Sequence, residues 1–393
     1  MKTIRDLDLK NKRVLVRVDF NVPQDKATRE VADDTRLRAA LPTLRYLIDQ
    51  GSKVVLVSHL GRPDGQVVEK LRLDPVARRL SDLLSKEVKK VNDCIGPEAE
   101  AAISNMKSGD LVLLENLRFH PEEEANDPAF SKALASLADV YVNDAFGTAH
   151  RAHASTAGVA DYLPSAAGFL IEKEVKALGG ALTNPARPFG AVIGGAKISS
   201  KIQVLDNLIE KVDGLFIGGA MACTFLKAKG YEMGGSLVED DQLDFALGLI
   251  KQAQLKGMTF LLPVDAVVAD RVDAAAEHKL VAITEVTAGW SVLDIGPATV
   301  GLFEKHLRSY KTVLWNGPMG VFEMESFASG TRSVAAFLSN LDANTIVGGG
   351  ESVAAVEGLG LADRFTHVST GGGATLEFIE GRTLPGIAAL EGK

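Results

Sequence analysis

The chain has little cysteine, few aromatic side chains and no long apolar run. Its 393 residues contain two cysteines, Cys94 and Cys223, which lie far apart and form no CxxC pair. This usage argues against zinc and against a disulfide scaffold, and it is typical of a reducing compartment. No apolar stretch reaches the length of a membrane span, and the first residues are too charged for a signal peptide. We therefore expect a cytoplasmic protein with no membrane partner.

An excess of positive charge is also missing. The 43 Lys and Arg are outnumbered by 51 Asp and Glu, the net charge is −8, and neither half of the chain is basic. A nucleic-acid partner is therefore not expected. The sequence contains neither GxGxxG nor GxxxxGK[ST]. A nucleotide-dependent dehydrogenase thus remains the weaker enzymatic alternative, and the loops are not of the Walker A type.

The pattern of apolar segments predicts an α/β fold. Short β-rich runs alternate with longer helical patterns, which indicates βαβ units and two doubly wound, parallel-sheet, Rossmann-like domains. One helix is predicted over 35–50, preceded by Asp33 and Asp34 as caps, kinked at Pro42 and ended by Gly51. Another is predicted over 73–86, with Asp74 as the cap. A helix over 168–182 followed by prolines predicts the domain boundary.

In the first half, polar and cationic side chains follow the strand-like runs. Because ligands bind beyond the carboxyl ends of strands in open α/β sheets, we expect these side chains to form a site for a small acid with several anionic groups. A single Arg here is more simply a surface or ion-paired residue, and His150 and His153 are poor candidates for a metal site. Glu122 to Glu124 are interpreted as a solvated loop. The candidates are Asp19, Asn21, Arg36, His59, Arg62, Arg118 and Arg151.

In the second half, glycines follow the strand-like runs instead. Bare backbone N–H groups at helix starts suit phosphates, although glycine after a strand is also ordinary turn chemistry. GGAKISSK (194–201) adds Lys197 and Lys201 on one helix face. Glu351 follows the glycines of GGGES (348–352), where it either stabilises the helix dipole or binds Mg²⁺ beside nucleotide phosphates. Glu323 could accept hydrogen bonds from a ribose.

Ten motifs in one order resemble the phosphoglycerate kinase family along the whole chain. They are RVDFNVP (17–23), DDTRLRAALPTL (33–44), SHLGRP (58–63), LLENLRFHPEEEAND (113–127), VNDAFGTAHRAHAST (142–156), GGAKISSKI (194–202), IGGAMACTFLKAKG (217–230), LDIGP (293–297), WNGPMGVFE (315–323) and STGGGATLEF (369–378). The resemblance implies reversible phosphoryl transfer from 1,3-bisphosphoglycerate to MgADP, giving 3-phosphoglycerate and MgATP.

The resemblance also implies an acid-binding domain over 1–170, a joining helix over 171–184, a nucleotide-binding domain over 185–379, and a tail, 380–393, that packs on the first domain. The protein would be a monomer. The acid site would be the seven residues named above, and catalysis would fall to Arg36, Lys197, Gly350 and Gly373. The implied nucleotide site comprises Gly195, Lys197, Lys201, Gly219, Leu293, Asn316, Pro318, Glu323, Gly349, Gly350, Glu351 and Ser352.

Three positions depart from the family pattern. Glu351 stands where Asp is usual, so it would hold Mg²⁺ directly or through a water molecule. Val292 stands where Gly is usual, against the expected adenine face, and Ser200 replaces a frequent Asp. The competing interpretation from another class is a non-catalytic two-domain protein that binds an acid and a nucleotide. The lysine pair at 197 and 201 argues against it.

Overall fold

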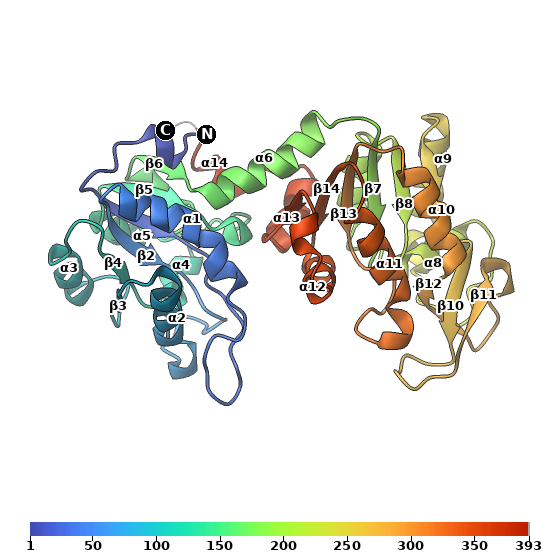
Figure 1. The fold of residues 1–393 in the computed structure, drawn as a ribbon, viewed down its shortest axis with the longest axis horizontal. Coiled ribbons are helices and arrows are strands. Elements are labelled where there is room, and N and C mark those ends of the chain that lie inside the picture. Colours follow the sequence, from blue (N-terminus) through green and yellow to red (C-terminus); the bar gives the residue numbers. More distant parts are fainter. Residues whose placement is uncertain (392–393) are drawn as a thin grey trace. The chain divides into compact units, whose positions relative to one another are not determined.

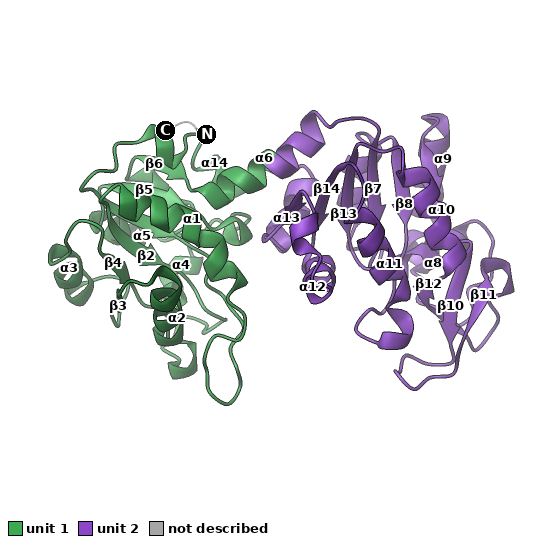
Figure 2. Cartoon of the chain, in the orientation of Figure 1, with its two compact units in different colours: residues 1–176, 383–393 green, residues 177–382 purple. Residues whose placement is uncertain are grey.

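The computed structural model describes residues 1–391, which fall into two compact units (Figure 2). Unit 1 contains Met1–Lys176 and the C-terminal residues from Thr383 on, and unit 2 contains Ala177–Arg382. The division lies inside helix α6 (Phe169–Thr183).

The C-terminal segment belongs to unit 1 through contacts with the loop that follows strand β5 (Val140–Asn143). The backbone N–H of Gly386 donates to the carbonyl oxygen of Ala149 at 2.8 Å. Helix α14 (Pro385–Ala388) forms in this segment. The last two residues of the expected tail, 392–393, lie outside the described residues.

Unit 1 is built on a six-stranded sheet in the order β3-β4-β2-β1-β5-β6, in which every pairing is parallel (Figure 1). Apart from the edge strand β3, its strands are largely buried, because helices cover the sheet. The other strands are β1 (Arg13–Arg17), β2 (Lys53–Val57), β3 (Val88–Lys90), β4 (Leu111–Leu113) and β6 (Ser165–Ala167). The other helices are α1 (Thr35–Asp49), α2 (Asp74–Leu84), α3 (Pro97–Ser104), α4 (Pro121–Glu124) and α5 (Pro128–Ser136).

The starts of two helices differ from the predicted caps. Asp34 precedes α1 but makes no capping hydrogen bond, because its carboxylate binds Arg38 at 2.7 Å and also Arg79. Asp74 is already the first helical residue of α2, after Leu73 at the cap position. The α1 helix continues through Pro42. Ion pairing by Asp34 thus replaces the capping role that its position suggests.

Unit 2 contains a second six-stranded parallel sheet, in the order β15-β14-β13-β7-β8-β9. The predicted α/β class with two parallel sheets is therefore confirmed. The strands are β7 (Phe189–Ile193), β8 (Gly214–Ile217), β9 (Thr259–Leu261), β13 (Thr312–Asn316), β14 (Asn344–Gly348) and β15 (His367–Val368). The helices are α7 (Ile202–Ile209), α8 (Met221–Ala228), α9 (Leu243–Leu255), α10 (Pro297–Leu307), α11 (Ser329–Leu338), α12 (Gly350–Gly358) and α13 (Gly373–Ile379).

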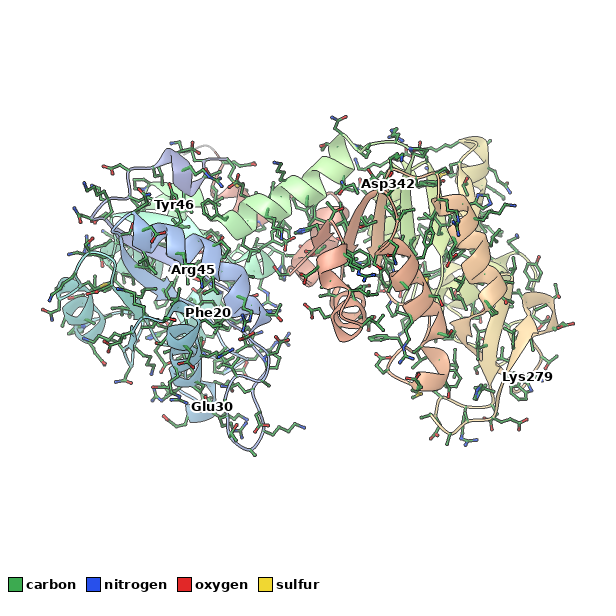
Figure 3. All side chains as sticks on the ribbon, viewed as in Figure 1. Phe20, Glu30, Arg45, Tyr46, Lys279 and Asp342 are labelled. Carbon is green, nitrogen blue, oxygen red and sulfur yellow. The ribbon has the colours of Figure 1, made fainter. Side chains whose placement is uncertain are left out.

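A small antiparallel sheet in unit 2 was not predicted. It consists of β11 (His278–Ala282), β10 (Asp265–Ala269) and β12 (Ser291–Ile295), in that order. Strand β11 is largely exposed. The Nζ atom of its Lys279, labelled in Figure 3, lies 4.0 Å from the ring centroid of Trp290. An exposed edge strand lacks the continuous apolar run by which the buried parallel strands are recognised.

The beginning of α6 is fixed on unit 1 by three contacts. The N–H of Phe169 donates to Thr43 Oγ1 at 2.9 Å, and that of Leu170 donates to Asp144 Oδ1 at 2.8 Å. Tyr46 of α1, labelled in Figure 3, packs edge-on against the ring of Phe169. Within residues 1–391, no helix is both long and apolar enough to span a membrane.

Candidate active site

In unit 1 the predicted acid-site residues lie at one edge of the sheet. Asp19 and Asn21 follow β1, His59 follows β2, Arg118 lies in the short helix η3 (Leu117–Phe119) after β4, and Arg151 follows β5. The strands β4, β2, β1 and β5 are consecutive neighbours in the sheet. Their carboxyl ends therefore meet, as the sequence pattern predicts.

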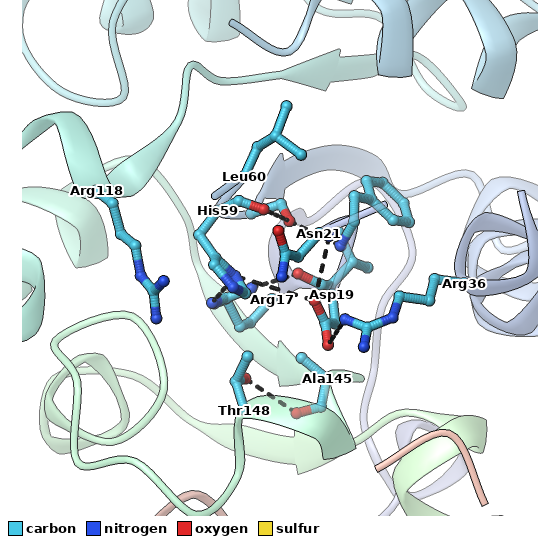
Figure 4. Close-up of polar contacts among 12 residues, drawn as sticks. Arg17, Asp19, Asn21, Arg36, His59, Leu60, Arg118, Ala145 and Thr148 are labelled. Carbon is cyan, nitrogen blue, oxygen red and sulfur yellow. Dashed lines mark hydrogen bonds and ion pairs between the residues drawn. The ribbon is translucent and has the colours of Figure 1, made fainter. Parts of the chain in front are cut away.

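Hydrogen bonds connect these side chains to one another and to the loop after β2. Arg36, at the start of α1, places Nη1 2.6 Å from Asp19 Oδ2. Asn21 Oδ1 accepts the N–H of Gly61, and Arg118 Nη1 donates to the carbonyl oxygen of Gly61, both at 2.9 Å. Figure 4 shows Arg118 and Arg36 on opposite sides of His59. Arg62 is on the same loop, next to Gly61.

His59 lies buried among the arginines. Burial lowers the pKa of its imidazole well below the usual value, and the charges of Arg17, Arg118, Arg151 and Arg36 lower it further. A neutral imidazole at physiological pH follows from its burial and from this surrounding positive charge.

Arg17 is a member of this cluster that the sequence pattern did not reveal. It is the last residue of β1, it is 1% exposed, and its Nη2 lies 3.2 Å from His59 Nδ1. Because a guanidinium has no acceptor, Nδ1 of the neutral ring must accept, which assigns the ring proton to Nε2. Arg17 thereby prepares His59 to donate a hydrogen bond from Nε2.

Glu123 corrects the interpretation of the acidic run as a solvated loop. Its carboxylate is fully buried in α4, and it accepts the N–H of Ser155 at 2.9 Å and the hydroxyl of Ser155 at 2.5 Å. Ser155 Oγ in turn accepts from Arg17 Nε at 2.9 Å. Glu124 is exposed but pairs with Arg118 at 3.1 Å. Two of the three glutamates therefore support the cationic cluster.

In unit 2 four glycine-bearing loops meet beyond β14, β13, β7 and β8, which are also consecutive neighbours. Gly195 donates its N–H to the carbonyl oxygen of Pro318 at 2.9 Å. Gly219 has φ +65°, and a Cβ added to it would lie 2.5 Å from the nitrogen of Gly195. Only glycine allows these two backbones to approach so closely.

Asn316 connects the other nucleotide-site candidates. Lys201 Nζ donates to Asn316 Oδ1, and Asn316 Nδ2 donates to the carbonyl oxygen of Gly348 at 2.8 Å. In the same turn, the N–H of Gly317 donates to Ser352 Oγ at 2.6 Å. Burial lowers the pKa of Lys201 to about 8, while the negative charges of Glu351 and Glu380 oppose that shift.

The remaining candidates surround this framework. Lys197 is exposed in the loop before α7, and Gly349 caps α12, whose first turn contains Gly350 and Glu351. Gly373 begins α13. The first N–H groups of an α-helix have no partner within the helix, so helix starts of this kind suit an anion.

Leu293 and Val292 lie on opposite faces of β12. Leu293 packs with Val321 and Met324, in the segment that contains Glu323. Val292 packs in a separate cluster that includes Cys223. The Val292 side chain therefore fills the core between α8 and the small sheet.

A carboxylate that the sequence pattern did not reveal holds the Lys197 loop. Glu239 accepts the N–H of Ser199 at 3.1 Å and its hydroxyl at 2.5 Å. The N–H of Glu239 donates to Thr224 Oγ1 of α8 at 3.1 Å. These bonds fix the loop that contains Lys197 against α8.

Comparison with known proteins decides the family. The family described as phosphoglycerate kinase matches residues 4–382. The chain belongs to the phosphoglycerate kinase family. A phosphoglycerate kinase of Moorella thermoacetica is 62% identical over 391 residues, covering 100% of this chain and 99% of that protein. One from Dictyoglomus turgidum is 58% identical over 391 residues, covering 99% and 98%.

Solved structures of phosphoglycerate kinases agree with this assignment. The enzyme of Coxiella burnetii has a TM-score of 0.90 at 44% identity and covers 99% of this chain and 98% of its own. That of Pyrococcus horikoshii has a TM-score of 0.85 at 35% identity, with 100% and 98% covered. The chain is thus a phosphotransferase, and neither the dehydrogenase nor the non-catalytic binding protein is favoured. Cytoplasmic location and a monomeric state stay predictions.

Proposed function

We propose that unit 1 binds 3-phosphoglycerate or 1,3-bisphosphoglycerate in its cationic cluster and that unit 2 binds ADP or ATP on its glycine loops. The observation that supports this division is the contrast between two sheet edges. One gathers guanidinium groups around a buried imidazole, and the other gathers glycine backbones and two lysines. Both suit anions, but the first suits a compact acid and the second a chain of phosphates.

The acid contacts are assigned to the guanidinium groups and His59. Arg62, Arg118 and Arg151 would bind phosphate or carboxylate oxygens, and His59 would donate from Nε2. Asp19 and Asn21 would orient Arg36 and the Gly61 loop through their hydrogen bonds. Arg36 would contact the transferring phosphoryl group.

The nucleotide contacts are assigned to the glycine framework. Lys201 would bind a phosphate. The backbones of Gly195 and Gly219 would lie against the nucleoside, together with Leu293 and Pro318. Glu323 would accept a hydrogen bond from a ribose hydroxyl. Asn316 positions Lys201 through their hydrogen bond. Gly349, Gly350 and Ser352 would contribute groups at the start of α12 to phosphate binding.

The residues present fit a Mg²⁺ ion that arrives with the nucleotide. Glu351 is exposed in the first turn of α12, and it is close enough to Lys201 for its charge to affect the pKa of that amine. A single carboxylate together with phosphate oxygens and water is a usual magnesium environment. Glu351 would hold the ion directly or through water, and the bound ion would supply neutralisation of phosphate charge.

The chemistry needs alignment rather than a general base. The attacking group is a carboxylate in one direction and a diphosphate oxygen in the other, and both are ionised near neutral pH. Arg36, Lys197 and the N–H groups at Gly350 and Gly373 would stabilise the charge on the phosphoryl group in transit. Because the substrates bind different units, transfer requires them to meet with water excluded, since water hydrolyses an acyl phosphate.

The direct test is ATP consumption with 3-phosphoglycerate and Mg²⁺, coupled to reduction of the acyl phosphate by an excess of a dehydrogenase that uses it. We expect activity only when all three components are present. Absence of turnover from a folded protein that binds MgADP would contradict the proposed acid substrate.

A further inference from the structure

Three potential metal ligands that are not among the acid-site candidates come together in unit 1. Asp93 and Cys94 lie in the loop between β3 and α3, and His120 follows η3. Their ligand atoms all lie within 4.8 Å of one another, and His120 Nε2 is 2.7 Å from Asp93 Oδ1. The Cys94 thiol is buried, with 1% of the residue exposed, whereas 27% and 47% of the His120 and Asp93 side chains are exposed. A cation could therefore enter from solvent and meet the thiol.

We propose that Asp93, Cys94 and His120 form a binding site for a zinc-type divalent cation, with water as a fourth ligand. Zn²⁺ accepts this mixture of oxygen, sulfur and nitrogen donors in tetrahedral geometry. Donors at zinc bond lengths lie roughly 3.3–3.8 Å apart around such an ion. The ion takes the place of the proton between His120 Nε2 and Asp93 Oδ1. On binding, these two atoms move apart by roughly several tenths of an ångström, and Cys94 Sγ moves toward the ion.

The carboxylate of Asp93, beside the thiol of Cys94, favours a cation at this position. Cysteine binds a metal ion as its thiolate, and the bound divalent cation stabilises that form. Binding forms metal–sulfur and metal–nitrogen bonds with no change in oxidation state. The thiol proton is released to solvent, and the neutral His120 ring carries its one proton on Nδ1 once Nε2 binds the ion.

The donor set selects the metal. A thiolate is a soft ligand that suits zinc or cobalt and is a poor partner for Mg²⁺. The site is therefore distinct in chemistry from the carboxylate assigned to magnesium, Glu351, which belongs to unit 2. The sequence shows no CxxC pair that would indicate this cluster. Its members are separated in the chain, and only folding brings residues 93–94 and 120 together.

Co²⁺ provides a probe whose signal does not depend on activity. We expect the full-length, metal-free protein to bind one equivalent of Co²⁺ with a thiolate-to-cobalt charge-transfer band, which Zn²⁺ removes and Mg²⁺ does not. Cys94→Ser should abolish the band, and His120→Ala should weaken cobalt affinity at least about tenfold. Cys223→Ser is the matched control, since Cys223 is the other buried free cysteine, and it should leave the band unchanged.

The proposal is overturned if the folded wild-type protein shows no charge-transfer band at saturating Co²⁺, or if Cys94→Ser retains it. Circular dichroism without metal establishes that each variant is folded. If Cys94→Ser does not fold, His120→Ala decides, because that side chain is partly exposed. Unchanged cobalt affinity in His120→Ala would then contradict the assignment. Neither cobalt measurement depends on phosphotransfer activity. A negative cobalt result would therefore leave the proposed function intact.

Discussion

The two units place their candidate anion sites at equivalent sheet edges, but the groups that line the two candidate sites differ. Unit 1 uses side chains. A buried series of hydrogen bonds holds them in place, running from Glu123 through Ser155 and Arg17 to His59. Unit 2 uses backbone N–H groups of its glycine-bearing loops. These loops pack so closely that a Cβ on Gly219 would collide with the backbone of Gly195. Under the proposed function, similar parallel sheets support two kinds of anion recognition, and the residues just beyond the carboxyl end of each strand determine which kind.

The largest effect is expected at Lys197, the exposed ammonium of the backbone-built site. Lys197→Ala should lower kcat roughly 10²-fold or more, because it removes a preorganised charge from the phosphoryl group in transit. Steady-state kinetics checks this result. Lys251→Ala, an exposed lysine on α9, is the control. Near-full activity of Lys197→Ala would remove Lys197 from the mechanism.

A smaller but still catalytic effect is expected at Arg36, in the side-chain-built site. Arg36→Ala should lower kcat at least about tenfold and weaken acid binding much less, because its contact strengthens in the transition state. Arg38→Ala offers a matched control on the same helix, since Arg38 is an exposed partner of Asp34. A fall in kcat of less than about threefold would refute the role of Arg36.

Nucleotide affinity should depend on pH through Lys201, whose pKa is lowered to about 8 by burial. A bound phosphate favours the ammonium form and raises that pKa. Above pH 8 binding must therefore take up a proton, and affinity should fall by up to about tenfold per pH unit. Calorimetric titration with ADP from about pH 7 to about pH 9.5 measures this slope. Lys201→Arg should flatten it, and an equal slope in that variant would exclude Lys201 as its source.

The last effect is on stability and not on catalysis, and it concerns buried carboxyls that hold helix starts, one in each unit. Burial raises the pKa of Asp144 to about 8 and that of Asp294 to about 7. Asp144 accepts the N–H of Leu170 in α6, and Asp294 accepts that of Gly330 in α11. An unfolded Asp titrates near about pH 4, so between those values the folded protein retains a proton that the unfolded chain has lost.

The free energy of unfolding should consequently decrease as pH rises from about 4 to 8, by up to about 1.4 kcal/mol per pH unit for each group. Urea unfolding at several pH values compares the wild type with Asp144→Asn, which cannot titrate. The difference between them should change across this range. A constant difference would show that Asp144 is already ionised in the folded state.

The sequence predicted the two parallel sheets and the sheet edges where the candidate residues gather, because the residues at strand ends carry most of this information. It could not identify Arg17, since a charged residue inside an apolar strand has no visible partner until Ser155 and Glu123 fold against it. The acidic run 122–124 gave no sign of which carboxylate is buried. The exposed strand β11 lacks the apolar pattern that marked the others, so the small antiparallel sheet was missed.

We propose that acid and nucleotide are recognised separately, by side chains in unit 1 and by the glycine framework with its lysine in unit 2. The most direct measurement is the pair of dissociation constants for 3-phosphoglycerate and MgADP in Arg118→Ala and Lys201→Ala. Arg118→Ala should weaken the acid at least about tenfold and leave MgADP within about twofold, and Lys201→Ala should do the reverse. Equal weakening of both ligands by either folded variant would contradict the account.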